Sequence, residues 1–131
     1  MLRYVEDEPG AARVEQIINL SRMGKCRLII SAVNWGEVSY ILTRKFGKDE
    51  ASGILRSLRA LPVSVAPVFA TEAEQAGEFK RQYNVPYADA FAGALAVTVE
   101  GTLVTTDYDF KTCVSAVAVE FLSAGAGRSK A

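Results

Sequence analysis

The sequence predicts an α/β fold with a mostly parallel central sheet. Short runs rich in β-branched and apolar residues alternate with longer segments of helical periodicity, and Gly or Pro separates most of them. The chain has 131 residues, of which 50% are hydrophobic and 23% are charged, and this is the composition of an ordinary globular domain. Because no internal repeat or linker-like stretch is present, we expect one domain over residues 1–122 and a flexible tail over residues 123–131.

The first half of the chain divides into five predicted elements: a helix over residues 11–23, a strand over 26–30, helices over about 32–46 and 48–60, and a strand over 62–68. The first helix places Val14, Ile17 and Ile18 on one side, and Gly24 is suited to end it. Ser31 is a preferred N-cap residue for the second helix. Prolines in the second strand favour an edge position, because proline donates no backbone hydrogen bond.

The second half divides into four predicted elements: a helix over residues 71–83, a helix over about 88–99, a strand over 102–105 and a strand over 117–121. Thr71 is expected to cap the first of these helices, and Asn84 and Pro86 are expected to end it. The next helix is rich in small residues, and Gly101 leads from it into the strand.

The balance of charged residues excludes several classes of function. The sequence contains 15 basic and 15 acidic side chains and no histidine. A net charge of zero argues against general electrostatic coating of nucleic acid, so binding would need a local patch. Without histidine, Ser-His-Asp and Cys-His sites and His-containing zinc sites are excluded. Acid–base chemistry would then depend on carboxylates, Lys, Tyr, Cys or a metal-bound water.

Cellular location is predicted from features that the sequence does not contain. No signal peptide is recognised, and no stretch of about 18 uncharged apolar residues predicts a membrane span. Cys26 and Cys113 do not form a CxxC motif, and each is interpreted as a small buried hydrophobic residue. We therefore expect a cytoplasmic protein that does not bind membranes.

Three acidic residues stand apart because their neighbours in the sequence are apolar or small. Glu37 lies in a helix that follows a predicted strand, Asp89 lies where a helix begins, and Asp107 ends a strand. In an open parallel sheet, the carboxyl ends of the strands and the helix starts beside them share one edge. A divalent cation would relieve the repulsion among carboxylates gathered there, and all-oxygen ligation favours Mg²⁺ or Mn²⁺.

Each of these acids also has a purely structural interpretation. Asp89 is suited to a helix N-cap, Glu37 to an exposed helical charge, and Asp107 to an Asx-turn after a strand. Taken singly, none of the three identifies a metal site. Their expected shared position at one sheet edge is the reason to consider a metal site beside the purely structural roles.

Three motifs in succession resemble the PIN domain: Ser31-Ala32…Glu37-Val38, Tyr87-Ala88-Asp89-Ala90, and Thr105-Thr106-Asp107-Tyr108-Asp109-Phe110. The sequence is most similar to the toxin members of VapBC-type toxin–antitoxin pairs, over residues 1 to about 122. The resemblance implies a PIN-like α/β/α sandwich. It also implies a Mg²⁺- or Mn²⁺-dependent ribonuclease that hydrolyses RNA phosphodiesters with a metal-activated water.

The resemblance further implies the site residues and the partners. The catalytic, metal-binding carboxylates carry over to Glu37, Asp89 and Asp107, with Asp109 as an additional candidate, and Thr105 or Thr106 could bond a metal-bound water. The implied partners are an RNA substrate, a cognate antitoxin and a second copy of the chain in a homodimer. Candidate phosphate-binding residues, which also suit a solvated helix face, are Arg44, Lys45, Lys48, Arg56, Arg59, Lys80 and Arg81.

One part of the family's pattern is not matched. PIN domains carry their first acidic ligand at the end of an N-terminal strand, whereas the segment from Met1 to Tyr4 matches the helix after that strand, and Asp7 matches the following loop. Three interpretations stay open: a start further upstream, which we favour; a relative that binds RNA or an antitoxin without cleavage; or another segment that fills the gap. A generic phosphate-binding α/β protein is disfavoured, because no GxGxxG or GxxxxGK[ST] loop is present.

Overall fold

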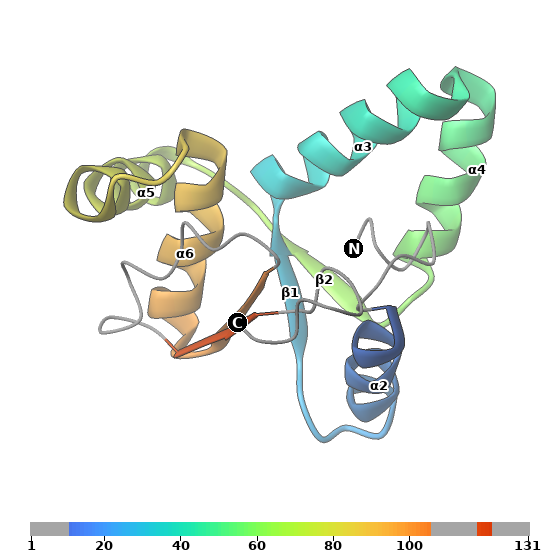
Figure 1. The fold of residues 1–131 in the computed structure, drawn as a ribbon, viewed down its shortest axis with the longest axis horizontal. Helices are drawn as coiled ribbons and strands as arrows, with labels where there is room; N and C mark the ends of the chain where they lie inside the picture. Colours follow the sequence, from blue (N-terminus) through green and yellow to red (C-terminus); the bar gives the residue numbers. More distant parts are fainter. Residues whose placement is uncertain (1–10, 106–117, 122–131) are drawn as a thin grey trace, which may run out of the picture. The chain divides into compact units, whose positions relative to one another are not determined.

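The protein is described by a computed structural model over residues 11–105 and 118–121 (Figure 1). Asp7, Cys113 and the predicted tail over residues 123–131 lie outside these ranges. The chain divides between Ala66 and Pro67 into two compact units. The elements of the first unit are α2 (Ala11–Arg22), β1 (Leu28–Ser31), α3 (Ala32–Phe46), α4 (Lys48–Arg59) and β2 (Val63–Ala66), and those of the second are α5 (Ala70–Tyr83), α6 (Tyr87–Val99), β3 (Thr102–Thr105) and β4 (Ala118–Phe121).

The first unit is built on a parallel pair of strands. β1 pairs with β2 in parallel, with Leu28 opposite Val63 and Ser31 opposite Ala66. At the end of β1 the chain enters α3 without an intervening loop (Figure 1). Ser31 makes this possible, because its buried side chain accepts a hydrogen bond of 3.2 Å from the Val33 N–H and so caps the helix. The predicted N-cap is confirmed.

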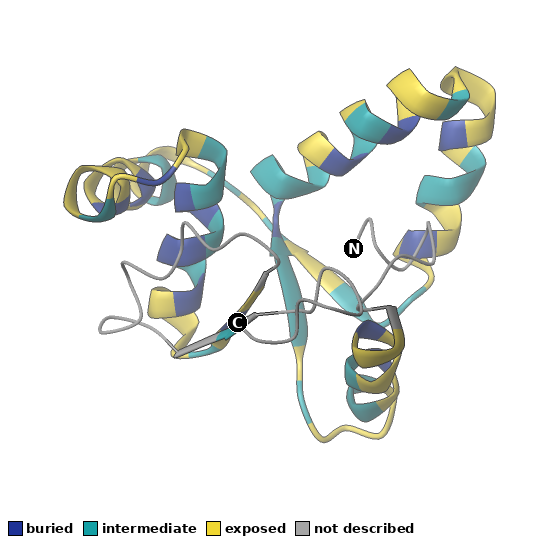
Figure 2. Cartoon of the chain, viewed as in Figure 1, coloured by how far each residue is buried: buried dark blue, intermediate teal, exposed yellow. Residues whose placement is uncertain are grey.

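The helices α3 and α4 form a helical hairpin with its own apolar core. Val38 and Leu42 of α3 are buried against Ala51 and Leu58 of α4, and half-buried apolar residues of both helices pack around them. Figure 2 shows these buried segments alternating with exposed ones along each helix. Gly47 joins the two helices with a φ of 84°, a left-handed conformation that glycine adopts without steric cost. The hairpin therefore has one apolar side and one exposed side on each helix.

The second unit combines a helix pair with another parallel strand pair. α5 packs against α6, and α6 packs against β3. Between α6 and β3 the chain reverses through Glu100, which has a φ of 54°, and Gly101. β3 pairs with β4 in parallel, from Thr102 opposite Ala118 to Thr105 opposite Phe121. The prediction of a mixed α/β fold with parallel strand pairing is confirmed.

Two of the predicted helix starts differ from the observed ones. Phe69, and not Thr71, is the N-cap residue of α5, and its N–H donates a 2.8 Å hydrogen bond to Oε1 of Glu72. This bond satisfies a backbone donor at the helix start, so α5 begins before Thr71. At α6 the N-cap position is held by Pro86, so Asp89 lies inside the first turn and is not a cap.

Two other predictions concern Cys26 and membrane segments. Cys26 is half-buried, and its thiol lies 3.7 Å from the Ile17 carbonyl oxygen, to which it donates. Over residues 11–105 and 118–121, no helix is both long and apolar enough to cross a membrane.

Candidate functional site

Glu37 lies on the exposed side of α3, close to the end of β1. Val38 beside it is buried in the hairpin core, whereas Glu37 lies about 100° away around the helix and is exposed. Nδ2 of Asn34 donates a 3.2 Å hydrogen bond to Oε1 of Glu37. Residues three positions apart on a helix are surface neighbours, so this contact follows from the spacing. The bond restricts the orientation of an accessible carboxylate.

Asp89 lies in the first turn of α6 and is half-buried. Apolar residues near it in the sequence, Val85, Ala90 and Phe91, are buried. The first turn is the positive end of the helix dipole, which favours a negative side chain. Because α6 reverses into β3, Asp89 lies at the end of α6 that is distant from the start of β3. The placement of Asp89 beside the carboxyl end of a strand stays a prediction.

The remaining predicted site residues are not placed by the structure. Asp107, Asp109 and Thr106 lie outside the described residues, and Thr105 is described only through its backbone, as the last residue of β3. Glu37 and Asp89 belong to different compact units. Within the part of the chain that the structure covers, no group of three or more acidic or cysteine side chains is placed to hold a metal ion. The predicted carboxylate cluster stays a prediction.

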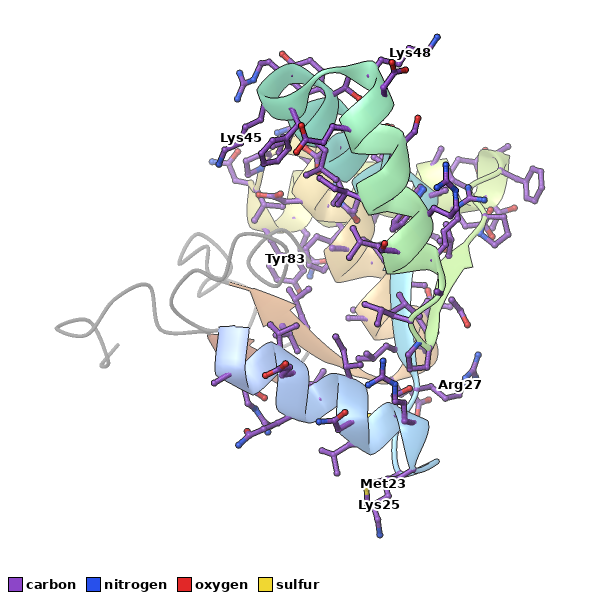
Figure 3. All side chains as sticks on the ribbon, turned by 90° about the vertical axis from the view of Figure 1, so that its right-hand side faces the viewer. Met23, Lys25, Arg27, Lys45, Lys48 and Tyr83 are labelled. Atoms are coloured by element: carbon purple, nitrogen blue, oxygen red, sulfur yellow. The ribbon has the colours of Figure 1, made fainter. Side chains whose placement is uncertain are left out.

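The candidate phosphate-binding residues differ in their surroundings. In the second unit, Lys80 donates to the Val85 carbonyl oxygen at 3.0 Å, and Arg81 forms an ion pair with Glu78. These two residues therefore have local structural roles. In the first unit, Lys45 and Lys48 lie where α3 is followed by α4, with their side chains directed away from the ribbon (Figure 3).

Comparison with protein families identifies the chain. The PIN domain family matches residues 1–113. The chain belongs to the PIN domain family. A comparison with curated protein sequences gives no significant match.

A solved structure has the same fold as this PIN domain. It is the crystal structure of VapBC2 from Rickettsia felis, bound to a DNA fragment from its promoter. The TM-score is 0.64 at 19% sequence identity, and the alignment covers 80% of this chain and 83% of the other. At this identity the similarity establishes the fold alone. The predictions of PIN membership and of a PIN-like α/β fold are confirmed.

The side chains described in this PIN domain suit a hard divalent cation in their chemistry. Glu37 and Asp89 both offer carboxylate oxygens, and these are the donors that Mg²⁺ and Mn²⁺ prefer. Glu37 is exposed and Asp89 is half-buried. The two residues are therefore suitable ligands by type.

Asn34 is a candidate functional residue that the sequence analysis did not single out. Its hydrogen bond to Glu37 is of the kind that orients metal-binding carboxylates in proteins. The signal in the sequence was the spacing of three positions between an amide and an acid on one predicted helix. The acidic motif of the family predicted a role for the carboxylate of Glu37, but not for the amide of Asn34 that donates to it.

Proposed function

We propose that this chain is a Mg²⁺- or Mn²⁺-dependent ribonuclease of the PIN-domain toxin type, which hydrolyses phosphodiester bonds of RNA. The observation that carries the proposal is the match to the PIN domain family over residues 1–113. The absence of histidine from the sequence supports it, because hydrolysis by a Ser-His-Asp or Cys-His site is excluded. The carboxylates on α3 and α6 supply side chains of the type that such chemistry needs.

In this proposal Glu37, Asp89 and Asp107 are the metal ligands and catalytic residues, and Asp109 is an additional ligand candidate. When bound, the divalent ion lowers the pKa of a water molecule and stabilises negative charge on the phosphate. Glu37 contributes a carboxylate whose orientation Asn34 restricts through the 3.2 Å hydrogen bond. Asp89 contributes a carboxylate in the first turn of α6, where the helix dipole favours its negative charge.

The proposal extends to the partners and the organisation of the chain. VapBC2 from Rickettsia felis, which shares the fold, was crystallised as a complex with DNA. By analogy, we propose that this chain pairs with a cognate antitoxin and forms a homodimer in the cytoplasm. Residues 1–122 would then form one PIN domain, followed by a flexible tail over residues 123–131.

The proposal is tested by incubating the purified protein with RNA in Mg²⁺ or Mn²⁺ and resolving the products by electrophoresis. Cleavage is expected with either metal and is expected to stop in EDTA. Asp89→Asn and Glu37→Gln should each lower the rate by about 100-fold or more, since each removes a proposed ligand. Glu50→Gln is the matched control, because Glu50 is an exposed acid in the first turn of α4 and should leave the rate unchanged.

Two results would contradict the ribonuclease proposal. Cleavage that persists in EDTA would show that no metal is required. Metal binding without cleavage of any RNA would favour a PIN-like module that binds RNA or an antitoxin without cutting it. Calorimetric titration with Mn²⁺ distinguishes this second case from simple loss of folding.

A further inference from the structure

The outer face of α3 carries exposed polar and aromatic side chains. Glu37, Tyr40 and Arg44 are spaced by three and four positions, so they share one face of the helix. All three are exposed, whereas Val38 and Leu42 on the opposite face are buried in the hairpin core. We call the face formed by Glu37, Tyr40 and Arg44 the outer α3 face.

Tyr40 is unusually exposed for an aromatic residue in the middle of a helix. Its relative exposure is 63%, so most of the ring surface is accessible to solvent. An exposed aromatic ring offers a flat apolar surface on which another ring can stack. The guanidinium carbon of Arg44 lies 5.5 Å from the Tyr40 ring centroid. This contact holds the cation beside an accessible ring.

Pairs of a cation and an aromatic ring are concentrated on the α3–α4 hairpin. Besides Tyr40 with Arg44, the guanidinium of Arg59 lies 5.8 Å from the Trp35 centroid, and Nζ of Lys45 lies 5.8 Å from that of Phe46. Of the three, only Tyr40 has an exposed ring, because Trp35 and Phe46 are half-buried. Among these three pairs, Tyr40 is thus the ring available for an external ligand.

We propose that the outer α3 face binds single-stranded RNA, with a base stacked on Tyr40 and a phosphate contacted by Arg44. This binding proposal rests on the proposed ribonuclease function in one respect, because the scissile phosphate is placed near Glu37. An accessible aromatic ring beside a cation is the combination by which proteins hold single strands, since every base has a face that can stack. A double helix keeps its bases stacked internally, so it could not use Tyr40 in this way.

The dimensions of the helix suit this arrangement. At 1.5 Å of rise per residue, Tyr40 lies ~4.5 Å and Arg44 ~10.5 Å along the axis from Glu37, a span of about two nucleotides. Lys45 and Lys48 add exposed positive charge just beyond Arg44 (Figure 3). Asp49 and Glu50 follow in the first turn of α4, where they complement its dipole. Positive charge therefore adjoins the ring at the end of the face farthest from Glu37.

The test measures RNA binding separately from cleavage. Fluorescence anisotropy of a labelled, single-stranded oligouridine is followed in EDTA, at several KCl concentrations. Tyr40→Ala should weaken binding by about fivefold or more, as expected for loss of one stacked base, and Tyr40→Phe should bind like the unsubstituted chain. Arg44→Gln should weaken binding and reduce the slope of log affinity against log salt by ~0.7, the value for one phosphate of a single strand.

Arg27→Gln is the matched control, because it removes the same charge from an exposed residue between α2 and β1, outside this face and outside the candidate phosphate-binding residues. It should leave the salt slope unchanged. The proposal is overturned if Tyr40→Ala binds as tightly as the unsubstituted chain, or if Arg27→Gln and Arg44→Gln lower the slope equally. It is also overturned if Tyr40→Ala alters self-association in sedimentation while RNA affinity stays constant, because the face would then contact a second copy. RNA binding that depends on Tyr40 in a chain without nuclease activity would support this face and refute the ribonuclease.

Discussion

Gly93 of α6 lies directly against the ring of Phe79 of α5, so close that a Cβ atom on Gly93 would overlap the ring. Both residues are buried, and Phe79 is only 5% exposed. The Phe79 ring also contacts Tyr83, with centroids 4.7 Å apart. The ring therefore has little freedom to move away. The absence of a side chain at position 93 is what allows α5 and α6 to approach this closely.

Gly93→Ala is expected to destabilise the protein by about 1–3 kcal/mol, the usual cost of overpacking a buried contact. Urea denaturation followed by circular dichroism measures the change. Gly77→Ala is the matched control, because no atom lies within 4 Å of its added Cβ. That substitution should stabilise α5 by ~0.5–1 kcal/mol through helix propensity. Equal effects of the two substitutions would contradict the packing argument.

Ser31→Ala is expected to cost about 1 kcal/mol of stability, because it removes the acceptor for the Val33 N–H at the start of α3. Ser31 is 3% exposed, so water cannot easily replace the lost oxygen. Ser57→Ala is the control: its exposed hydroxyl only bonds back to the Gly53 carbonyl within α4. Its effect should stay within about 0.5 kcal/mol. Thermal unfolding of the two variants measures whether the Ser31 cap contributes to the stability of the folded protein.

Asn34→Ala is expected to weaken Mn²⁺ binding by roughly tenfold or more, because Glu37 would lose the hydrogen bond that restricts its carboxylate. Isothermal titration calorimetry measures the affinity without requiring activity. Asn19→Ala is matched to it, since Asn19 also bonds a residue three positions along its helix, Arg22. Asn19→Ala should leave Mn²⁺ affinity unchanged. Unaltered affinity in Asn34→Ala would mean that Asn34 does not position a metal ligand.

The ion pair between Glu78 and Arg81 on α5 predicts a small dependence of stability on acid. The hydrogen bond and the charge of Arg81 lower the pKa of Glu78 below its ordinary value. A lowered pKa in the folded state means that the pair stabilises the protein above the unfolded-state pKa of Glu78. This contribution is lost as the pH falls through the folded-state pKa.

Glu78→Gln should therefore flatten the acid limb of the curve of melting temperature against pH. The two side chains are 59% and 71% exposed, so solvent screens the pair and the change should be small and weaker at high salt. Glu74→Gln removes the same charge from the same helix and should leave the acid limb as it is. An identical curve for both variants would show that the pair does not couple to folding.

Most elements of the fold follow from local patterns in the sequence. Ser31 predicted the start of α3, and Asn84 and Gly47 predicted helix ends, because capping and left-handed conformations depend on only a few neighbouring residues. The N-cap of α5 was missed because Phe69 has no side-chain oxygen. It uses the carboxylate of Glu72 instead, and propensity alone does not anticipate this reciprocal bond.

The site could be predicted in part. Glu37 and Asp89 occur on the predicted helices, close to the predicted helix starts. Their relation to each other and to Asp107 depends on how segments distant in sequence come together, which periodicity does not encode. The close contact between Gly93 and Phe79 could not be predicted either, since nothing in the sequence specifies which ring a small residue will meet.

The pairing of the strands also determines how the protein can unfold. In the described residues, Leu28 pairs with Val63 and Thr102 pairs with Ala118, so each parallel pair is completed inside one compact unit. Strand pairs whose two strands belong to the same unit can form and break as separate cooperative steps. The hydrogen-bonded amide protons of β1 and β2 should therefore exchange in deuterium with one shared free energy of opening, and those of β3 and β4 with another.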